Sequence, residues 1–152
     1  MSVSLEESIR RHSFFRDMGV GDVSSIAVHA KHLTFDADRF IFREGEDADA
    51  LYLITHGRVS LELSTAHRGR IIIQTIEEDD VLGISWLFPP YKWHFDARAL
   101  TLTRLIMIDA AQIRKRCEED NAFGYRMMSR LVGIIMRRLQ AVRLQLLEME
   151  EM

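Results

Sequence analysis

Cysteine, proline and net charge are all scarce in this sequence. Among its 152 residues are one cysteine and two prolines, and 20 basic and 23 acidic residues leave a formal charge of -3. A single cysteine, Cys117, cannot form a disulfide within the chain. The nearly balanced charge offers no net attraction for nucleic acid. A chain of this length has room for one structural domain.

Long apolar runs are also missing. The apolar stretch Leu131–Met136 is interrupted by Gly133 and followed by Arg137, so it is far shorter than the roughly 18 to 20 residues that cross a bilayer. The residues that follow Met1 lack the apolar core of a secretory signal. We therefore expect a cytoplasmic protein without a membrane partner.

The spacing of apolar residues changes twice along the chain. Residues 1–33 show helical spacing, with Asp22 as the expected N-cap, and predict short N-terminal helices. Residues 34–109 contain short β-rich runs between turn residues: Arg39–Arg43, Leu51–Thr55, Val59–Leu63, Ile71–Ile76 and Thr103–Ile108. We expect a mainly β fold with flanking α-helices, in which about eight strands pair in sequence order as a jelly-roll β-barrel.

Residues 110–152 return to a helical pattern. A helix over Ala110–Glu118 is expected first, and then, after a cap at Asp120 or Asn121, a long helix to the C-terminus. Its apolar residues alternate steps of three and four, the period of a coiled-coil seam, and they are Tyr125, Met128, Val132, Ile135, Leu139, Val142, Leu146 and Met149. We expect a homodimer, and the alternative is a seam packed on its own barrel. The expected dimer interface is Val132, Ile135, Leu139, Val142 and Leu146.

Several segments together resemble one known family. Phe40–Val59 is similar to the first hairpins of the cyclic nucleotide-binding domain family, and Asp79–Gly83 is similar to the start of its phosphate-binding cassette. Ala97–Thr101 and Leu105–Asp109 resemble the strands that leave this cassette. Met136–Gln140 resembles the long helix through which the catabolite-activator and fumarate-nitrate regulator relatives dimerise. The resemblance implies a regulatory or sensor domain that is not an enzyme.

The longer relatives in this family also carry a DNA-binding element. Those relatives place a helix-turn-helix after the long helix, whereas this chain stops at Met152. We therefore expect no element for direct contact with nucleic acid, and a protein partner that reads the state of the dimer.

The resemblance further implies a Gly-Glu pair for the ribose hydroxyl and an Arg for the cyclic phosphate, because a guanidinium matches phosphate oxygens in charge and geometry. The position of that Glu is Ile84, next to Ser85, and the position of that Arg is Trp93. An alternative register makes Arg98 the phosphate ligand. Lys92 and His94 are other candidate sources of positive charge. Val142 and Arg143 stand at the helix positions where the resemblance implies hydroxyls that contact the adenine.

These departures predict weak or absent binding of cyclic AMP and cyclic GMP. The aromatic residues near the cassette predict either a pocket for another small ligand or a plug of the barrel interior. Two alternatives to an altered sensor stay open: a functional cyclic-nucleotide binder that regulates a transcription or signalling partner, and a ligand-free structural dimer. The candidate pocket residues are Gly83, Ile84, Ser85, Trp86, Trp93, His94 and Arg98, and the neighbouring aromatic residues are Tyr91 and Phe95.

Other chemistry finds little support in the residue pattern. The six histidines are scattered, and only His29 and His32 share a helical spacing, so we expect no metal site. No serine has an evident base or nucleophile elbow, so we expect no catalytic residue. Cys117 follows Arg114, Lys115 and Arg116, which would allow a lowered pKa and redox sensing. A structural cysteine is the alternative.

Overall fold

A computed structural model describes residues 4–151 of the chain, and these residues divide into two compact units. The first unit runs to Arg114 and holds the two N-terminal helices and the strands. The second unit begins at Lys115. The division lies inside helix α3 (Ala110–Glu119), later than the boundary expected at residue 109.

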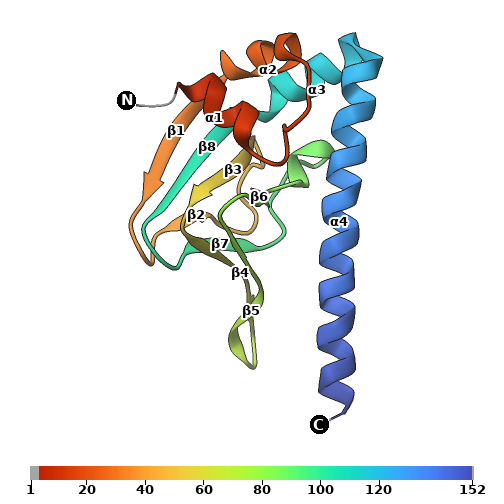
Figure 1. Cartoon of the computed structure of the whole chain (residues 1–152). Helices are drawn as coiled ribbons and strands as arrows, with labels where there is room; N and C mark the ends of the chain where they lie inside the picture. The colour runs from red at the N-terminus through yellow and green to blue at the C-terminus, as the bar shows by residue number, and fades with distance from the viewer. Residues whose placement is uncertain (1–3, 152) are drawn as a thin grey trace. The chain divides into compact units, whose positions relative to one another are not determined.

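Eight strands among the described residues form two antiparallel sheets of four strands each (Figure 1). The order in the first sheet is β1-β8-β3-β6, and in the second it is β2-β7-β4-β5. This arrangement confirms the predicted jelly-roll fold. The bounds in the first sheet are β1 (Ala30–Phe35), β8 (Thr103–Asp109), β3 (Ala50–His56) and β6 (Val81–Leu82). The bounds in the second are β2 (Phe40–Phe42), β7 (Asp96–Ala99), β4 (Arg58–Thr65) and β5 (Gly69–Glu77).

The prediction that the strands pair in sequence order is wrong. Among the described strands, only β4 and β5 are paired neighbours in sequence. Strand β8 instead lies between β1 and β3, and β7 lies between β2 and β4. Burial explains this order, because pairs of distant residues such as Leu53 and Ile106 lie opposite each other and are both fully buried. Local turn signals carry no information about such distant partners.

The barrel interior lies between the two sheets. The ring of Phe42 in β2 lies 6.1 Å from the ring of Tyr52 in β3, so aromatic side chains connect the sheets. The turn from β3 to β4 passes through Gly57, whose φ is +102°. A Cβ at this position would lie 2.6 Å from the carbonyl oxygen of Leu102. The turn therefore requires glycine in both conformation and space.

Two short helices, α1 (Leu5–Arg11) and α2 (Val20–Ala27), pack against each other beside β1 at one end of the barrel (Figure 1). The prediction that Asp22 caps a helix is wrong, because Gly19 is the N-cap of α2. Asp22 lies in the first turn, where its negative charge is favourable near the helix N-terminus. Strand β1 begins at Ala30, so the last residues of the range 1–33 are not helical.

The segment after α1 is held on the turn between β5 and β6 by side-chain hydrogen bonds. The buried ring of His12 contacts the carbonyl oxygen of Asp80 through Nε2 at 3.1 Å and accepts the Phe14 N–H through Nδ1 at 3.2 Å. Together these bonds require the neutral tautomer with its hydrogen on Nε2. The Ser13 N–H also donates to Asp79 Oδ1 at 2.9 Å.

The second unit consists of the end of α3 and the 30-residue helix α4 (Asn121–Glu150). The side chain of Asp120 accepts hydrogen bonds from the N–H groups of Ala122 and Phe123, which confirms the predicted cap. No helix among residues 4–151 is long and apolar enough to cross a membrane.

Helix α4 carries two apolar faces. One face is buried and consists of Phe123, Met127, Leu131 and Ile134. The predicted seam is a different face: Val132, Ile135, Leu139 and Leu146 are 54%, 45%, 60% and 59% exposed, and Val142 is half-buried. Four of the five seam residues are thus open to solvent in the single chain.

Candidate functional site

The candidate site is built on residues 83–95, which connect β6 to β7. Gly83 leaves β6 with a φ of +96° and is followed by a short 3-10 helix, η1 (Ser85–Leu87), for which Ile84 is the N-cap. Trp86 is fully buried, and its Nε1 donates a hydrogen bond of 2.8 Å to the carbonyl oxygen of Gly83. The first half of the segment therefore folds back on Gly83.

Trp93 occupies the interior beside Gly83. Its side chain is 2% exposed, and its indole is stacked on the Phe42 ring with 3.8 Å between ring centroids and 7° between planes. The Tyr52 ring lies 6.3 Å away at a tilt of 34°. A Cβ built on Gly83 would lie 2.5 Å from Cη2 of Trp93. We call the space bounded by Gly83, Phe42 and Tyr52 the indole slot.

Backbone hydrogen bonds hold the end of the segment against the loop between β2 and β3. The N–H of Trp93 donates to the carbonyl oxygen of Glu46 at 3.0 Å, and the N–H of Gly45 donates to the carbonyl oxygen of Trp93 at 2.9 Å. The N–H of Ala48 donates to the carbonyl oxygen of Tyr91 at 2.7 Å. The position of the indole is thus fixed by its backbone as well as by its ring contacts.

Arg114 of α3 contacts both halves of the same segment. Its Nη1 donates a 2.6 Å hydrogen bond to the carbonyl oxygen of Trp86. Its guanidinium carbon lies 4.3 Å from the centroid of the Tyr91 ring, a cation–π contact. A cavity of about 450 Å³ beside this contact is lined by residues that include Asp47, Lys92 and Arg114. One arginine therefore stabilises the segment near its beginning and near its end.

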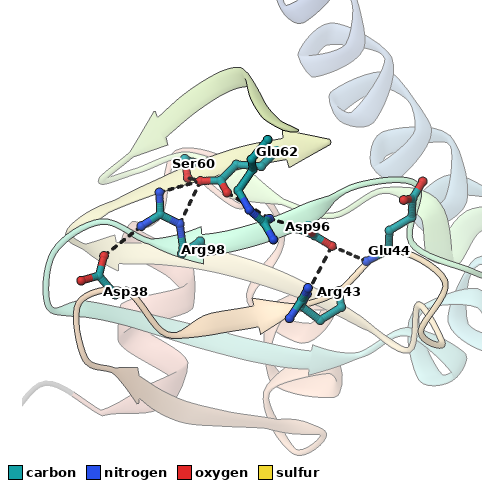
Figure 2. Close-up of polar contacts among 8 residues, drawn as sticks. Asp38, Arg43, Glu44, Ser60, Glu62, Asp96 and Arg98 are labelled. Carbon is teal, nitrogen blue, oxygen red and sulfur yellow. Dashed lines mark hydrogen bonds and ion pairs between the residues drawn. The ribbon is translucent and has the colours of Figure 1, made fainter. Parts of the chain in front are cut away.

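Arg98, the alternative phosphate ligand, lies in β7 within a network of ion pairs (Figure 2). Its Nε donates to Glu62 Oε2 at 3.0 Å, and its Nη1 donates to Asp38 Oδ1 at 2.8 Å. Glu62 is fully buried and also accepts hydrogen bonds from Ser60 and, at 3.2 Å, from Arg70. The guanidinium of Arg98 is therefore engaged by carboxylates of the protein itself.

A second buried carboxylate extends this network. Asp96 accepts the Glu44 N–H at 2.7 Å and a hydrogen bond from Arg70 at 2.8 Å, and Arg43 lies at 3.5 Å (Figure 2). Burial raises the pKa of Asp96, but these partners outweigh it and hold the pKa below its usual value. The same holds for Glu62, whose pKa is raised by burial and lowered more by Arg98, Ser60 and Arg70. Both groups are carboxylates at neutral pH.

The structure brings together some of the predicted site residues. Gly83 accepts a hydrogen bond from Trp86 and lies against the ring of Trp93. Ile84 and Ser85 are half-buried in the same segment, whereas His94 is exposed and Arg98 belongs to the ion-pair network. Burial raises the pKa of Tyr52, which faces Trp93, to about 12, with smaller contributions from Asp49 and Glu46.

Four residues around the site were missed by sequence reasoning: Phe42, Tyr52, Glu62 and Arg114. Phe42 and Tyr52 belong to the segment that carries the family resemblance, but nothing in their spacing shows that they contact Trp93. Glu62 could have been identified from the sequence, because it is an acidic residue inside the β-rich run Val59–Leu63. A charge at such a position needs a partner when it is buried.

The basic neighbours of Cys117 do not lower its pKa, so the alternative of redox sensing at this cysteine loses its support. Burial raises the pKa of this thiol, and the charge of Glu118 raises it further. A raised pKa leaves less thiolate, the reactive form. Among residues 4–151, no group of three or more His, Cys, Asp or Glu side chains is arranged to hold a metal ion.

Comparisons with known proteins agree on one family. Residues 32–120 match the family model described as the cyclic nucleotide-binding domain. A crystal structure of a candidate cyclic nucleotide-binding protein from Geobacter metallireducens GS-15 is similar, with 26% identity and a TM-score of 0.79 over 91% of this chain and 99% of that chain. The sensor domain of the transcriptional regulator DNR from Pseudomonas aeruginosa has 14% identity and a TM-score of 0.72 over 89% of this chain and 91% of that chain.

A curated relative is much longer than this chain. It is a candidate potassium channel protein of Rhodopseudomonas palustris (strain ATCC BAA-98 / CGA009), 26% identical over 106 residues. The match covers 70% of this chain and 25% of the channel protein. The part of the chain that matches therefore spans about a quarter of the length of that relative.

Proposed function

Because the chain belongs to the cyclic nucleotide-binding domain family, we propose that it is a dimeric regulatory module in which an altered pocket binds cyclic AMP and cyclic GMP weakly or not at all. Its fold is that of the Crp/Fnr-like regulatory domains. The observation that carries the proposal is the Trp93 indole, which is stacked on Phe42 in the barrel interior. The family resemblance assigns the phosphate-binding arginine to this position.

The expected loss of affinity follows from the missing polar groups. A charge-assisted hydrogen bond contributes about 1.5 to 3 kcal/mol, and each 1.4 kcal/mol changes affinity about tenfold. Trp93 offers no positive charge to a cyclic phosphate, and Ile84 offers no carboxylate to a ribose hydroxyl. Losing both contacts should weaken binding by about a hundredfold or more.

Arg98 is a poor replacement for the missing arginine. Its guanidinium is ion-paired with the fully buried Glu62 at 2.9 Å and with Asp38 at 2.8 Å. A move of Arg98 toward a phosphate would leave Glu62 with fewer partners, and breaking a buried ion pair is unfavourable. The ion-pair network thus favours the register in which Trp93 takes the arginine position.

The exposed seam of α4 supports the dimer. An apolar stripe of this length is rarely left in water, and a second copy would present the same stripe at the same spacing. In the proposed module, a change in residues 83–95 alters the paired helices, and a protein partner in the cytoplasm reads that change. The module acts by binding, with no catalytic step.

Thermal unfolding with and without nucleotide tests the pocket proposal. A ligand present at a thousand times its Kd stabilises the native state by about 4 kcal/mol, which would raise the Tm by several degrees. We expect no such increase with 1 mM (about a thousand times a micromolar Kd) cyclic AMP or cyclic GMP. An increase of that size with either nucleotide would overturn the proposal.

A further inference from the structure

We propose that the indole slot is a binding site for planar heteroaromatic rings that the chain fills with its own Trp93. Trp93 then acts as an internal ligand that keeps residues 83–95 closed, and an external ring can enter only when Trp93 leaves. This inference rests on the altered pocket of the proposed function and adds the class of ligand and the way in which the site is blocked.

The slot has the geometry of a ring-binding site. The ring of Phe42 is stacked on the indole, with 3.8 Å between the ring centroids and 7° between the ring planes. Aromatic ligands also use such stacking. On another side, Gly83 lies so close to the indole that a Cβ would be 2.7 Å from Cζ3 of Trp93. The position without a side chain therefore lets a ring lie against the backbone.

The slot also differs from an ordinary core position in how its occupant is attached. The Trp93 ring lies against Phe42 of β2 and Gly83, the residue after β6, whereas its backbone is hydrogen-bonded to Gly45 and Glu46 in the loop after β2. Placement of the ring and closure of the segment are therefore linked. Loss of the ring should loosen the hydrogen bonds of Gly45 and Ala48 to the segment, because their N–H groups donate to the carbonyl oxygens of Trp93 and Tyr91.

The chemistry of the lining selects the class of ligand. Phe42 and Tyr52 supply aromatic faces, and burial keeps the Tyr52 hydroxyl protonated with a pKa of about 12, so it carries no charge. Arg98, in the strand β7 that follows the segment, is ion-paired with Glu62 and Asp38. An uncharged planar ring of the size of indole fits this lining better than an anion does.

Restoring the ring from solution tests the inference. Trp93→Gly removes the indole, and the probe is free indole. We expect the variant to bind indole with a Kd of about 1 mM or tighter, a range allowed for a ligand of about nine non-hydrogen atoms. Hydrogen–deuterium exchange at the amides of Gly45 and Ala48 should be faster in the variant and should slow again when indole is added. The wild-type protein should not bind indole.

Two matched variants separate a ring site from a simple cavity. Trp86→Gly removes the other fully buried tryptophan of the segment, and we expect indole to give no protection at Gly45 and Ala48 there. Phe42→Leu, added to Trp93→Gly, should weaken indole binding about two- to tenfold because one aromatic pair is lost. A folded Trp93→Gly that does not bind indole, equal protection in Trp86→Gly, or no effect of Phe42→Leu would each overturn the inference.

Trp93→Leu provides the test if Trp93→Gly does not fold, because it keeps an apolar side chain without the flat ring. We expect the Gly45 and Ala48 amides to exchange about tenfold faster than in the wild type, the change that corresponds to 1.4 kcal/mol in the opening equilibrium. Exchange at the wild-type rate would overturn the inference. A failure here leaves weak nucleotide binding untouched, whereas tight binding of cyclic AMP by the wild type would overturn the proposed function itself.

Discussion

The indole of Trp93 fills the space that a side chain at Gly83 would need: a Cβ there would lie 2.5 Å from Cη2 of the indole. The two residues are ten positions apart in sequence, at opposite ends of the segment between β6 and β7. Their contact closes this segment on the barrel interior. The stability of the barrel and the state of its pocket therefore depend on the same side chain.

Replacing Trp93 by Ala should lower the free energy of unfolding by about 3 to 5 kcal/mol, the usual effect of deleting a buried tryptophan. The dimer should persist, because the substitution lies outside the seam of α4. Urea unfolding followed by circular dichroism measures the change. The control is His94→Ala at the next, exposed position, which should change stability by less than about 0.5 kcal/mol. Trp93→Ala with wild-type stability would show that the indole does not support the barrel.

Replacing Leu139 by Glu should dissociate the proposed dimer. Leu139 is at the centre of the seam and is 60% exposed in the single chain, so two copies would place two carboxylates against each other in an apolar interface. Sedimentation velocity at micromolar concentration should show a dimer for the wild type and a monomer for the variant. Gln140→Glu adds the same charge one residue later, outside the seam, and should remain dimeric. A variant at Leu139 that stays dimeric would place the interface elsewhere.

Replacing Glu62 by Ala should destabilise the second sheet. The buried carboxylate accepts hydrogen bonds from Arg98, Arg70 and Ser60, and we expect a loss of about 1 to 3 kcal/mol, since both arginines keep access to water. The matched control is Asp38→Ala, which removes the other, 81% exposed partner of Arg98 and should have an effect of less than about 1 kcal/mol. Equal effects of the two substitutions would argue against a structural role for the buried carboxylate.

Mild acid should destabilise the protein through His12. Burial lowers the pKa of His12 below 6.5, and this outweighs the opposing effects of Asp79 and Asp80. As the pH falls through 6.5, the unfolded chain takes up a proton that the folded state does not, so the unfolding free energy should fall, and this loss should end below the folded pKa.

Urea unfolding at several pH values between about 7.5 and 5 measures this dependence. His12→Gln removes the titrating ring and keeps a side-chain N–H donor, so its unfolding free energy should change less over this range. The control is His56→Gln, on the exposed surface, which should keep the wild-type pH dependence. A His12→Gln variant with unchanged pH dependence would assign the effect to another group.

Elements with strong local signals could be predicted from the sequence. The cap at Asp120 and the apolar period of α4 follow from side chains that act within one or two turns. The short β-rich runs within residues 34–109 predicted the jelly-roll fold, which residues 4–151 confirm. The prediction of the N-cap of α2 was wrong because Gly19 has no side chain that marks it as a cap. Asp22 is favourable both as a cap and in the first turn of a helix.

The features that could not be predicted from the sequence depend on contacts between residues far apart in the chain. The position of β8 beside β3 is favoured by burial of residues from both strands, and β1 then pairs with the other edge of β8. The engagement of Arg98 by Glu62 joins β7 to β4, and the stacking of Trp93 on Phe42 joins the segment after β6 to β2. Spacing along the chain cannot show which of two distant partners an aromatic or charged side chain will find.

Calorimetric titration of the wild-type protein with cyclic AMP, and in parallel with cyclic GMP, is the direct test of weak or absent nucleotide binding. We expect no submicromolar binding, because Trp93 and Ile84 stand where the family resemblance implies charged groups for the phosphate and the ribose. A Trp93→Arg variant, measured alongside, should gain affinity for the nucleotide if it folds. A submicromolar Kd of the wild type for either nucleotide would show that the pocket binds cyclic nucleotides and would overturn the proposed function.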